Sequence, residues 1–174
     1  MYNNIFDSHA HYDDKKFDGD RESLLRSLLF RGVKGVVNAG CCVRSSYTSL
    51  ELAEKYDIIY ATAGIHPNDC LKTDKGYLKE LETLLSHKKV VAIGEIGLDY
   101  HYEDTDRIKQ QIMFRKQMEL ARKHGVPVII HDRDAHADSL DMIREFPDVT
   151  CVLHSFSGSA EMAKEAVKLG CYIS

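Results

Sequence analysis

The sequence predicts an α/β fold built around a parallel sheet. Short apolar runs alternate with longer amphipathic stretches along all 174 residues, and the runs begin 21 to 36 residues apart. The runs are rich in Val, Ile and Ala, and most of them do not alternate with polar residues, as expected for strands buried on both faces. A regular alternation of such strands with helices is typical of a parallel sheet.

Seven apolar runs are predicted to be strands. In chain order they are Ile5–His9, Val33–Ala39, Ile58–Ile65, Val90–Ile96, Val126–His131, Thr150–His154 and Cys171–Ser174. The stretches between them have the apolar spacing of amphipathic helices. These predicted helices are Arg21–Phe30, Ser45–Tyr56, Tyr77–His87, Thr105–His124, His136–Phe146 and Ser159–Leu169.

The longest predicted helix, Thr105–His124, has signals at both ends. Asp104 or Thr105 is suited to cap its start, and Gly125 followed by Pro127 stops it. Its apolar residues at roughly helical spacing are Ile108, Ile112, Met118 and Ala121. We expect these to form its buried face.

The length predicts a single domain over residues 1–174. Two architectures fit the alternation: an open doubly wound sheet and a (β/α)8 barrel. No Gly-rich phosphate loop follows the first strand, which weakens the dinucleotide-binding form of the open sheet. A complete barrel needs roughly 200–250 residues, and this sequence stops inside the seventh strand, so the barrel reading predicts a truncated one.

The composition excludes several classes of protein. An apolar fraction of 44% and a charged fraction of 29% are globular values. No apolar run reaches the roughly 18–20 residues of a membrane span, and the N-terminus lacks the features of a signal peptide. We therefore expect a cytoplasmic protein with no membrane partner. The net charge of −4 argues against a broad basic surface for nucleic acid, and five cysteines without CxxC spacing argue against disulfides and structural zinc.

The first predicted strand ends in two histidines. Residues i and i+2 lie on one face of a strand, so His9 and His11 are expected to point the same way. Two adjacent imidazoles form a clamp for a divalent metal and are costly to bury otherwise. Taken alone, the pair fits a surface loop with chance histidines equally well.

Four further strands carry similar residues near their ends. His66 follows the third, Glu95 lies within the fourth, and His131 and His154 end the fifth and sixth. The carboxyl ends of parallel strands meet at one edge, where such folds place their sites. A buried Glu95 needs a cation, and its own strand offers none. We therefore expect these side chains to converge on metal.

The number of ligands favours two metal ions. Four histidines and a carboxylate exceed the three protein ligands of an open catalytic zinc site. With Glu95 as a bridge, His9 and His11 would hold one ion, and His131 and His154 the other. Such pairs stabilise the attacking and leaving oxygens in phosphoester hydrolysis. Imidazole-rich ligation suits Zn²⁺, Mn²⁺, Ni²⁺ or Fe²⁺ better than Mg²⁺, so the identity of up to two divalent cations stays open.

Five segments in order resemble the TatD family of metal-dependent deoxyribonucleases, among the amidohydrolase-like barrels. They are FDSHAHYDD, GIHP, AIGEIGLDY, PVIIHDRDA and VLHSFSGS, and together they cover nearly the whole chain. Each is weak alone, but the ordered set is specific. The resemblance implies a (β/α)8 TIM-type barrel, here truncated to about seven parallel strands. It also implies hydrolysis of phosphodiester bonds in DNA, single-stranded or at its ends.

The resemblance also implies roles for individual residues. The implied metal ligands are His9, His11, Glu95, His131 and His154, with Glu95 bridging the ions as the catalytic residue. The implied substrate-binding residues are His66, Asp99 and Arg133, of which His66 and Arg133 hold substrate phosphate.

One part of the family pattern is absent from this sequence. The family's last ligand is an aspartate on the eighth strand, in a segment resembling E-T-D-x-P-Y, and the sequence ends at Ser174 without it. That aspartate is also the usual general base, so none is named here. Asp7, Asp132 and Asp134 are expected to serve as turn or capping groups.

Two alternatives to the nuclease stay open. The same barrel and metals also suit hydrolysis of an amide or ester bond, and without the last ligand the chain could be an inactive metal-binding fragment. An unfinished barrel exposes two strand edges, so we also expect self-association through them.

Overall fold

A single parallel sheet organises the chain. The computed structural model describes residues 4–174. Its strands are β1 (Ile5–Ala10), β2 (Val33–Asn38), β3 (Ile59–Ala63), β4 (Val90–Asp99), β5 (Val128–Arg133), β6 (Cys151–Leu153) and β7 (Tyr172–Ile173). They follow one another in the sheet in chain order, and every neighbouring pair is parallel. A doubly wound sheet reverses its strand order at a switch point, so the sequential order selects the barrel architecture.

Helices connect successive strands on the outside of the sheet. They are α1 (Arg21–Phe30), α2 (Val43–Lys55), α3 (Tyr77–Leu85), α4 (Arg107–His124), α5 (His136–Arg144) and α6 (Ala160–Lys168), with the 3₁₀ helices η1 (Lys15–Phe17) and η2 (Pro67–Lys72) after β1 and β3. The sequence did not predict η1 or η2. No helix in residues 4–174 is long and apolar enough to cross a membrane.

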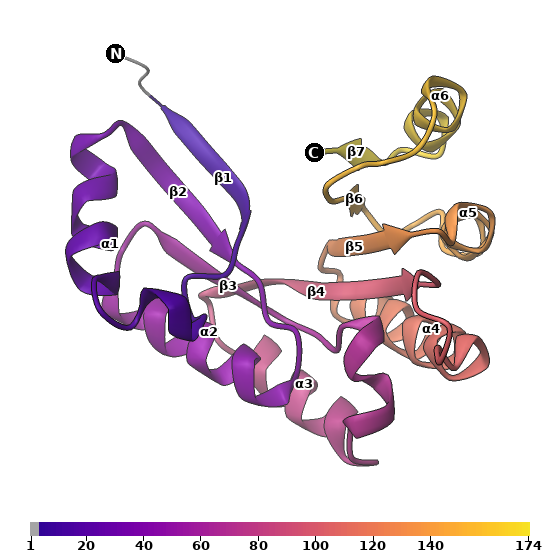
Figure 1. Ribbon diagram of the computed structural model, residues 1–174, viewed down its shortest axis with the longest axis horizontal. Helices are drawn as coiled ribbons and strands as arrows, with labels where there is room; N and C mark the ends of the chain where they lie inside the picture. The colour runs from indigo at the N-terminus through magenta and orange to yellow at the C-terminus, as the bar shows by residue number, and fades with distance from the viewer. Residues whose placement is uncertain (1–3) are drawn as a thin grey trace.

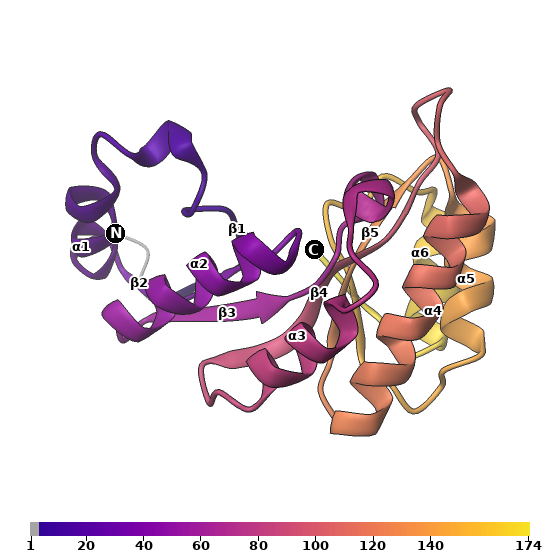
Figure 2. The ribbon, with the colours of Figure 1, turned by 90° about the horizontal axis from the view of Figure 1, so that it is seen from below.

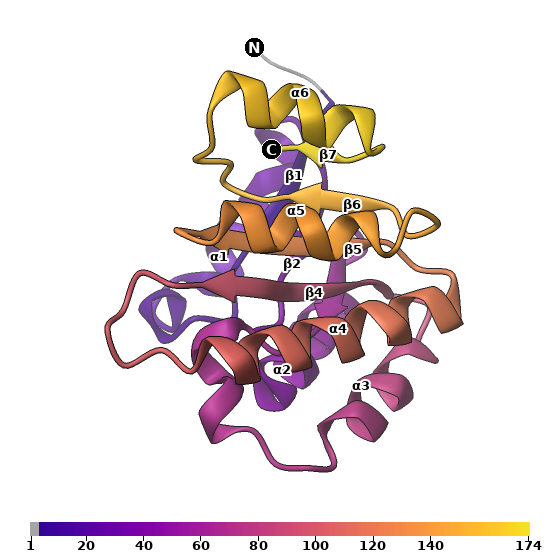
Figure 3. The same cartoon turned by 90° about the vertical axis from the view of Figure 1, so that its right-hand side faces the viewer.

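The sheet curls into an incomplete barrel. β1 and β2 lie across an open space from β5, β6 and β7 (Figure 1). Seen from below, α1 and α2 accompany the first strands at one end, and α4, α5 and α6 accompany the last strands at the other (Figure 2). Figure 3 shows α4, α5 and α6 covering the outer face of β4 to β7. The predicted α/β fold with about seven parallel strands is confirmed.

The buried face of α4 contains two of the four predicted residues, Met118 and Ala121, which are fully buried. Ile108 and Ile112 are 73% and 49% exposed, while Gln110 and Gln117 are almost fully buried. Gln110 bonds the backbone of Asp99, and Gln117 bonds that of Ile65. The apolar pattern predicts only part of this face, because two buried amides that satisfy backbone groups lie on it beside the apolar residues.

The ends of α4 follow the predicted chemistry with one shift. The N-cap is Asp106, whose carboxylate accepts from the backbone N–H of Lys109, and not Asp104 or Thr105. Gly125 ends the helix in the left-handed region, with φ of 64°, as glycine does at helix C-termini.

All five cysteines are free; three are buried, and Cys41 and Cys42 are partly exposed.

Two of the irregularities in strand register lie at residues of the predicted site. Between Asp7 and Ala10, β1 has one residue more than the partner segment of β2. Between Ile93 and Ile96, β4 has one residue more than β5. Bulges re-aim side chains next to functional sites. Here they contain His9 and Glu95.

Candidate metal centre

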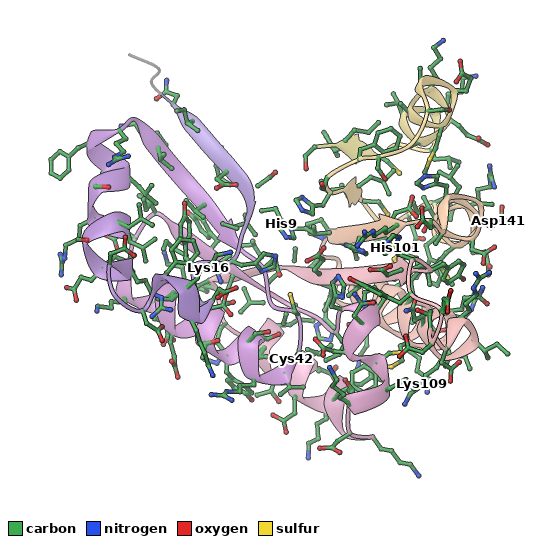
Figure 4. The ribbon with its side chains drawn as sticks, viewed as in Figure 1. His9, Lys16, Cys42, His101, Lys109 and Asp141 are labelled. Atoms are coloured by element: carbon green, nitrogen blue, oxygen red, sulfur yellow. The ribbon has the colours of Figure 1, made fainter. Side chains whose placement is uncertain are left out.

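His9 and His11 meet ring to ring at the carboxyl end of β1. Their Nε2 atoms are 2.8 Å apart. His11 Nδ1 lies 3.1 Å from the carbonyl oxygen of Ala39, which fixes the ring with Nε2 directed at His9 and Glu95. His9 Nδ1 is buried and has no hydrogen-bond partner among the described residues. Figure 4 shows His9 in the space between β1 and the strands of the opposite side.

Glu95 stands between two pairs of histidines. It is only 4% exposed. Its Oε2 lies 3.3 Å from His9 Nε2 and 3.5 Å from His11 Nε2. Its Oε1 lies 3.0 Å from His131 Nδ1 and 3.9 Å from His66 Nε2. Each carboxylate oxygen therefore faces its own pair of imidazoles, which is the arrangement of a bridging carboxylate.

The charges of this cluster depend on one another. Burial alone raises the pKa of Glu95, but hydrogen bonds with His11, His131 and His9 outweigh it, and the net pKa lies well below the usual range. The hydrogen bond to Glu95 raises the pKa of His11. Burial lowers the pKa of His131, and its contacts with Glu95 and Asp99 raise it overall. Glu95 is thus an anion that attracts cationic charge from both sides.

His66 and His154 are neutral imidazoles near neutral pH. Burial lowers the pKa of each to about 4, assisted at His154 by the neighbouring His9. Neutral imidazole is the form that binds metals. The two rings are nevertheless placed differently. His66 groups with Glu95 and His131, whereas His154 stacks on His9, with ring centroids 3.4 Å apart.

Asp99 contacts His131 on the side of its ring that faces away from Glu95. It is 1% exposed, and its Oδ2 lies 3.2 Å from His131 Nε2. Asn68 Nδ2 donates to the same oxygen at 3.0 Å, and the backbone N–H of His101 donates to Oδ1. A carboxylate that holds one nitrogen of a metal-binding histidine fixes its orientation. In this structure Asp99 therefore contacts His131, whereas the sequence assigned it to substrate.

Arg133 lies apart from the histidines, at the end of β5. It is exposed, and its guanidinium carbon is 5.7 Å from the ring centroid of Tyr102. An exposed guanidinium at the rim of the centre is placed to meet a solvent-borne anion.

The other acidic residues near the strand ends are engaged in contacts with neighbouring groups. Asp7 Oδ1 accepts from the backbone N–H of His9, and Asp132 accepts from Ser139 Oγ and lies 2.7 Å from His136 Nδ1. Asp134 pairs with His101 at 2.9 Å. Asp7 thus holds a local turn, as expected. The capping role expected of the other two is not observed, because α5 begins after Ala135 without a side-chain cap, and Asp132 and Asp134 contact side chains instead.

Sequence reasoning missed three residues around the centre. Asn68 and Gln110 hold Asp99, and only a prediction of η2 and of the buried face of α4 would reveal them. Cys41 Sγ lies 3.9 Å from Glu95 Oε2, and burial, then the charge of Glu95, raise the pKa of its thiol. Cys41 is consequently a neutral neighbour of the centre.

The donor set fits divalent metal. Two groups place their ligand atoms within 4.8 Å of one another: His9, His11 and Glu95, and His66, Glu95 and His131. Imidazole nitrogens with one carboxylate suit borderline metals such as zinc. The close approach of the Nε2 atoms of His9 and His11, 2.8 Å apart beside Glu95, fits a cation at this edge.

A parallel barrel sheet with histidines around a buried glutamate at the carboxyl ends of its strands is the architecture of a metal-dependent hydrolase. A family model described as TatD related DNase matches residues 6–174, and the chain belongs to this family.

Individual relatives agree with the family match. The chain is 37% identical over 172 residues to the uncharacterized metal-dependent hydrolase YabD of Bacillus subtilis (strain 168), covering 98% of this chain and 68% of YabD. It is 31% identical over 171 residues to the 3′-5′ ssDNA/RNA exonuclease TatD of Cronobacter sakazakii, covering 97% and 65%. The crystal structure of the TatD homolog YJJV from Escherichia coli K12 superposes with a TM-score of 0.90 at 34% identity, covering 97% and 66%. The chain thus spans about two thirds of the length of these relatives.

Proposed function

We propose that this chain binds up to two divalent metal ions at Glu95 and hydrolyses phosphodiester bonds in DNA, in single strands or at duplex ends. The observation that carries the proposal is the pairing of each Glu95 oxygen with a different pair of histidines. The names of the relatives, a metal-dependent hydrolase and an ssDNA/RNA exonuclease, support the same chemistry.

The proposed ligands keep the assignment made from the sequence. His9 and His11 hold one ion, His131 and His154 hold the second, and Glu95 bridges them. When bound, two such ions supply charge stabilisation to the attacking and leaving oxygens of a phosphodiester. The stack of His154 on the ligand His9 supports its assignment. The nearness of His66 to Glu95 makes it the competing ligand.

The remaining residues of the site orient the metal ligands or bind the substrate. Asp99 holds the ring of His131 through Nε2, which keeps Nδ1 directed at Glu95. Arg133 at the rim binds a substrate phosphate, and His66 lies on the same side as His131, with ring centroids 4.4 Å apart. The imidazole-rich donor set favours Zn²⁺, Mn²⁺, Ni²⁺ or Fe²⁺ over Mg²⁺.

Self-association is a further part of the proposal. Within residues 4–174, β1 pairs only with β2 and β7 only with β6. These edge strands carry Phe6 and Tyr172, which are 59% and 65% exposed. Unpaired edges with apolar side chains invite pairing with another chain, and we propose a second copy of this chain as the partner.

The test is reconstitution of the metal-stripped protein. Each candidate cation is added in turn, bound metal is counted by elemental analysis, and hydrolysis is followed on single-stranded DNA, blunt duplex DNA, a dipeptide and a lactone. We expect metal-dependent cleavage of DNA alone. Cleavage of the dipeptide or lactone in preference to DNA would move the function to the amide or ester class. Metal binding without any hydrolysis would identify an inactive metal-binding protein.

A further inference from the structure

A cavity of about 320 Å³ adjoins the metal centre between η2 and the loop from β4 to α4. The residues that shape it include Asn68, Leu71, Tyr102, Thr105, Asp106 and Gln110. Asn68 connects the cavity to the centre, because it donates to the Asp99 oxygen that lies 3.2 Å from His131 Nε2. The cavity is therefore joined to His131, a proposed metal ligand, through the contacts of Asn68 and Asp99.

The walls of this cavity include two exposed apolar side chains. Leu71 and Tyr102 are 58% and 49% exposed, and both line the same space. The ring of Tyr102 is held edge-on by His101 at 5.2 Å. An exposed aromatic ring beside an aliphatic side chain is suited to a flat aromatic ligand, since any base can stack on an aromatic side chain.

The polar groups of the cavity distinguish a base from a phosphate. Asp104 and Asp106 line it, and their carboxylates repel an anion but accept hydrogen bonds from exocyclic amino groups, as acidic side chains do with cytosine. The positive charge lies outside the cavity lining, where the Arg133 guanidinium carbon is 5.7 Å from the Tyr102 ring centroid. A nucleotide matches this separation of acidic walls from the cationic Arg133, with its base inside the cavity and its phosphate toward the guanidinium.

We propose that this cavity is a nucleobase subsite, in which a base of single-stranded DNA stacks on Tyr102 against Leu71 while its phosphate meets Arg133. The inference rests on the proposed function and specifies how that centre holds its substrate. Tyr102 is here a binding residue for the substrate. Thr105 and Gln110 bond the backbone of Asp99 and keep the cavity wall attached to the centre.

Fluorescence tests the subsite without any hydrolysis. The chain contains no tryptophan, so Tyr102→Trp introduces a single reporter at the proposed stacking position. In EDTA, we expect an oligodeoxynucleotide to quench this tryptophan. A series of oligonucleotides of the same length is then compared, each with an abasic site at a different position. We expect the member that lacks the base at the stacking position to lose the quenching. Phe30→Trp, at an 86% exposed aromatic residue on α1, is the matched control and should not respond.

Kinetics supply the second measurement. Stacking of one base corresponds to roughly a 5- to 150-fold effect, so Tyr102→Ala should lower kcat/KM on single-stranded DNA by that factor and Tyr102→Phe should retain it. On the substrate that is abasic at the sensitive position, Tyr102→Ala and the unmodified chain should be equal. Equal quenching by intact and abasic strands, or an undiminished Tyr102→Ala effect on abasic DNA, would overturn the subsite. Base-dependent quenching in a protein that cleaves no DNA with any metal would instead overturn the proposed function.

Discussion

The imidazole of His154 lies flat on that of His9, with ring centroids 3.4 Å apart and ring planes 8° from parallel. His9 lies in β1, the first strand of the sheet, and His154 directly follows β6, the strand next to the last. Their stack therefore spans the open side of the barrel and joins the first strand to the sixth.

This stack allows the role of His154 to be tested. Phenylalanine can stack but cannot ligate, so His154→Phe should preserve the fold and lower the bound metal from two ions to one. His66→Phe is the matched variant at the competing histidine, and it should keep both ions and raise KM. Elemental analysis of the reconstituted proteins gives the number of bound ions in each variant. The reverse result, two ions in His154→Phe and one in His66→Phe, would exchange the two assignments.

Glu95 is the residue whose loss should affect both ions. Glu95→Gln keeps the size of the side chain but removes the charge that both pairs of histidines face. Even removal of a group that only orients a ligand typically costs about 10–100-fold, so we expect a loss of at least roughly 100-fold in hydrolysis. Bound metal should fall at both sites. Glu161→Gln, on the exposed surface of α6, is the control and should leave both properties unchanged.

Arg133 should act in binding and not in the chemical step. Its exposed guanidinium is placed to interact equally with substrate phosphate and with the transition state, so Arg133→Ala should raise KM with little change in kcat. Arg133→Lys should recover part of the affinity, because lysine keeps the charge without the two-pronged geometry. Steady-state kinetics on single-stranded DNA measure both. A fall of kcat and kcat/KM by the same factor would place the guanidinium in the transition state.

Most of the fold could be predicted because burial on both faces imposes a recognisable pattern. The apolar run Val90–Ile96 marks the central strand directly, and the sequential order of parallel strands follows from the alternation with helices. The convergence of His9 and Glu95 follows in turn, since the carboxyl ends of parallel strands meet. These inferences need only local patterns and one topological rule.

The finer structure of the centre needs tertiary information. A bulge leaves no local signature, so the re-aiming of Glu95 between Ile93 and Ile96 could not be foreseen. The support of Asp99 by Gln110 depends on the rotation of α4, and the apolar pattern predicted only part of the buried face of that helix. The contact between His154 and His9 depends on the curl of the whole sheet.

Gly97 allows β4 and β5 to lie close together beneath the centre. Its φ is +132°, and a Cβ atom there would lie 2.0 Å from the carbonyl oxygen of His131. Gly97→Ala should lower the free energy of unfolding by roughly 3 kcal/mol or more, since backbone strain and a steric clash combine. Gly125→Ala is the control, with φ of +64° and open space around it, and should cost only about 1–2 kcal/mol. Urea unfolding of both variants gives the comparison, and equal losses would refute the close approach.

Self-association through the sheet edges should depend on the apolar side chains that the edges expose. Phe6 on β1 and Tyr172 on β7 are 59% and 65% exposed, and burying a large aromatic side chain contributes about 1.5–3 kcal/mol. Replacing both with lysine places charge on each edge, which natural sheets use against edge pairing. We therefore expect Phe6→Lys/Tyr172→Lys to weaken the dimer by at least roughly tenfold in Kd.

The measurement is sedimentation over a concentration series. Phe30→Lys is the control, because Phe30 is 86% exposed but lies at the end of α1 and outside both edges. Phe6 also covers Gly35, so urea unfolding of the double variant is needed to separate lost association from lost stability. A dimer that Phe30→Lys disrupts and the double variant leaves intact would place the contact on the helical surface, and a chain that stays monomeric at every concentration would exclude self-association through the edges.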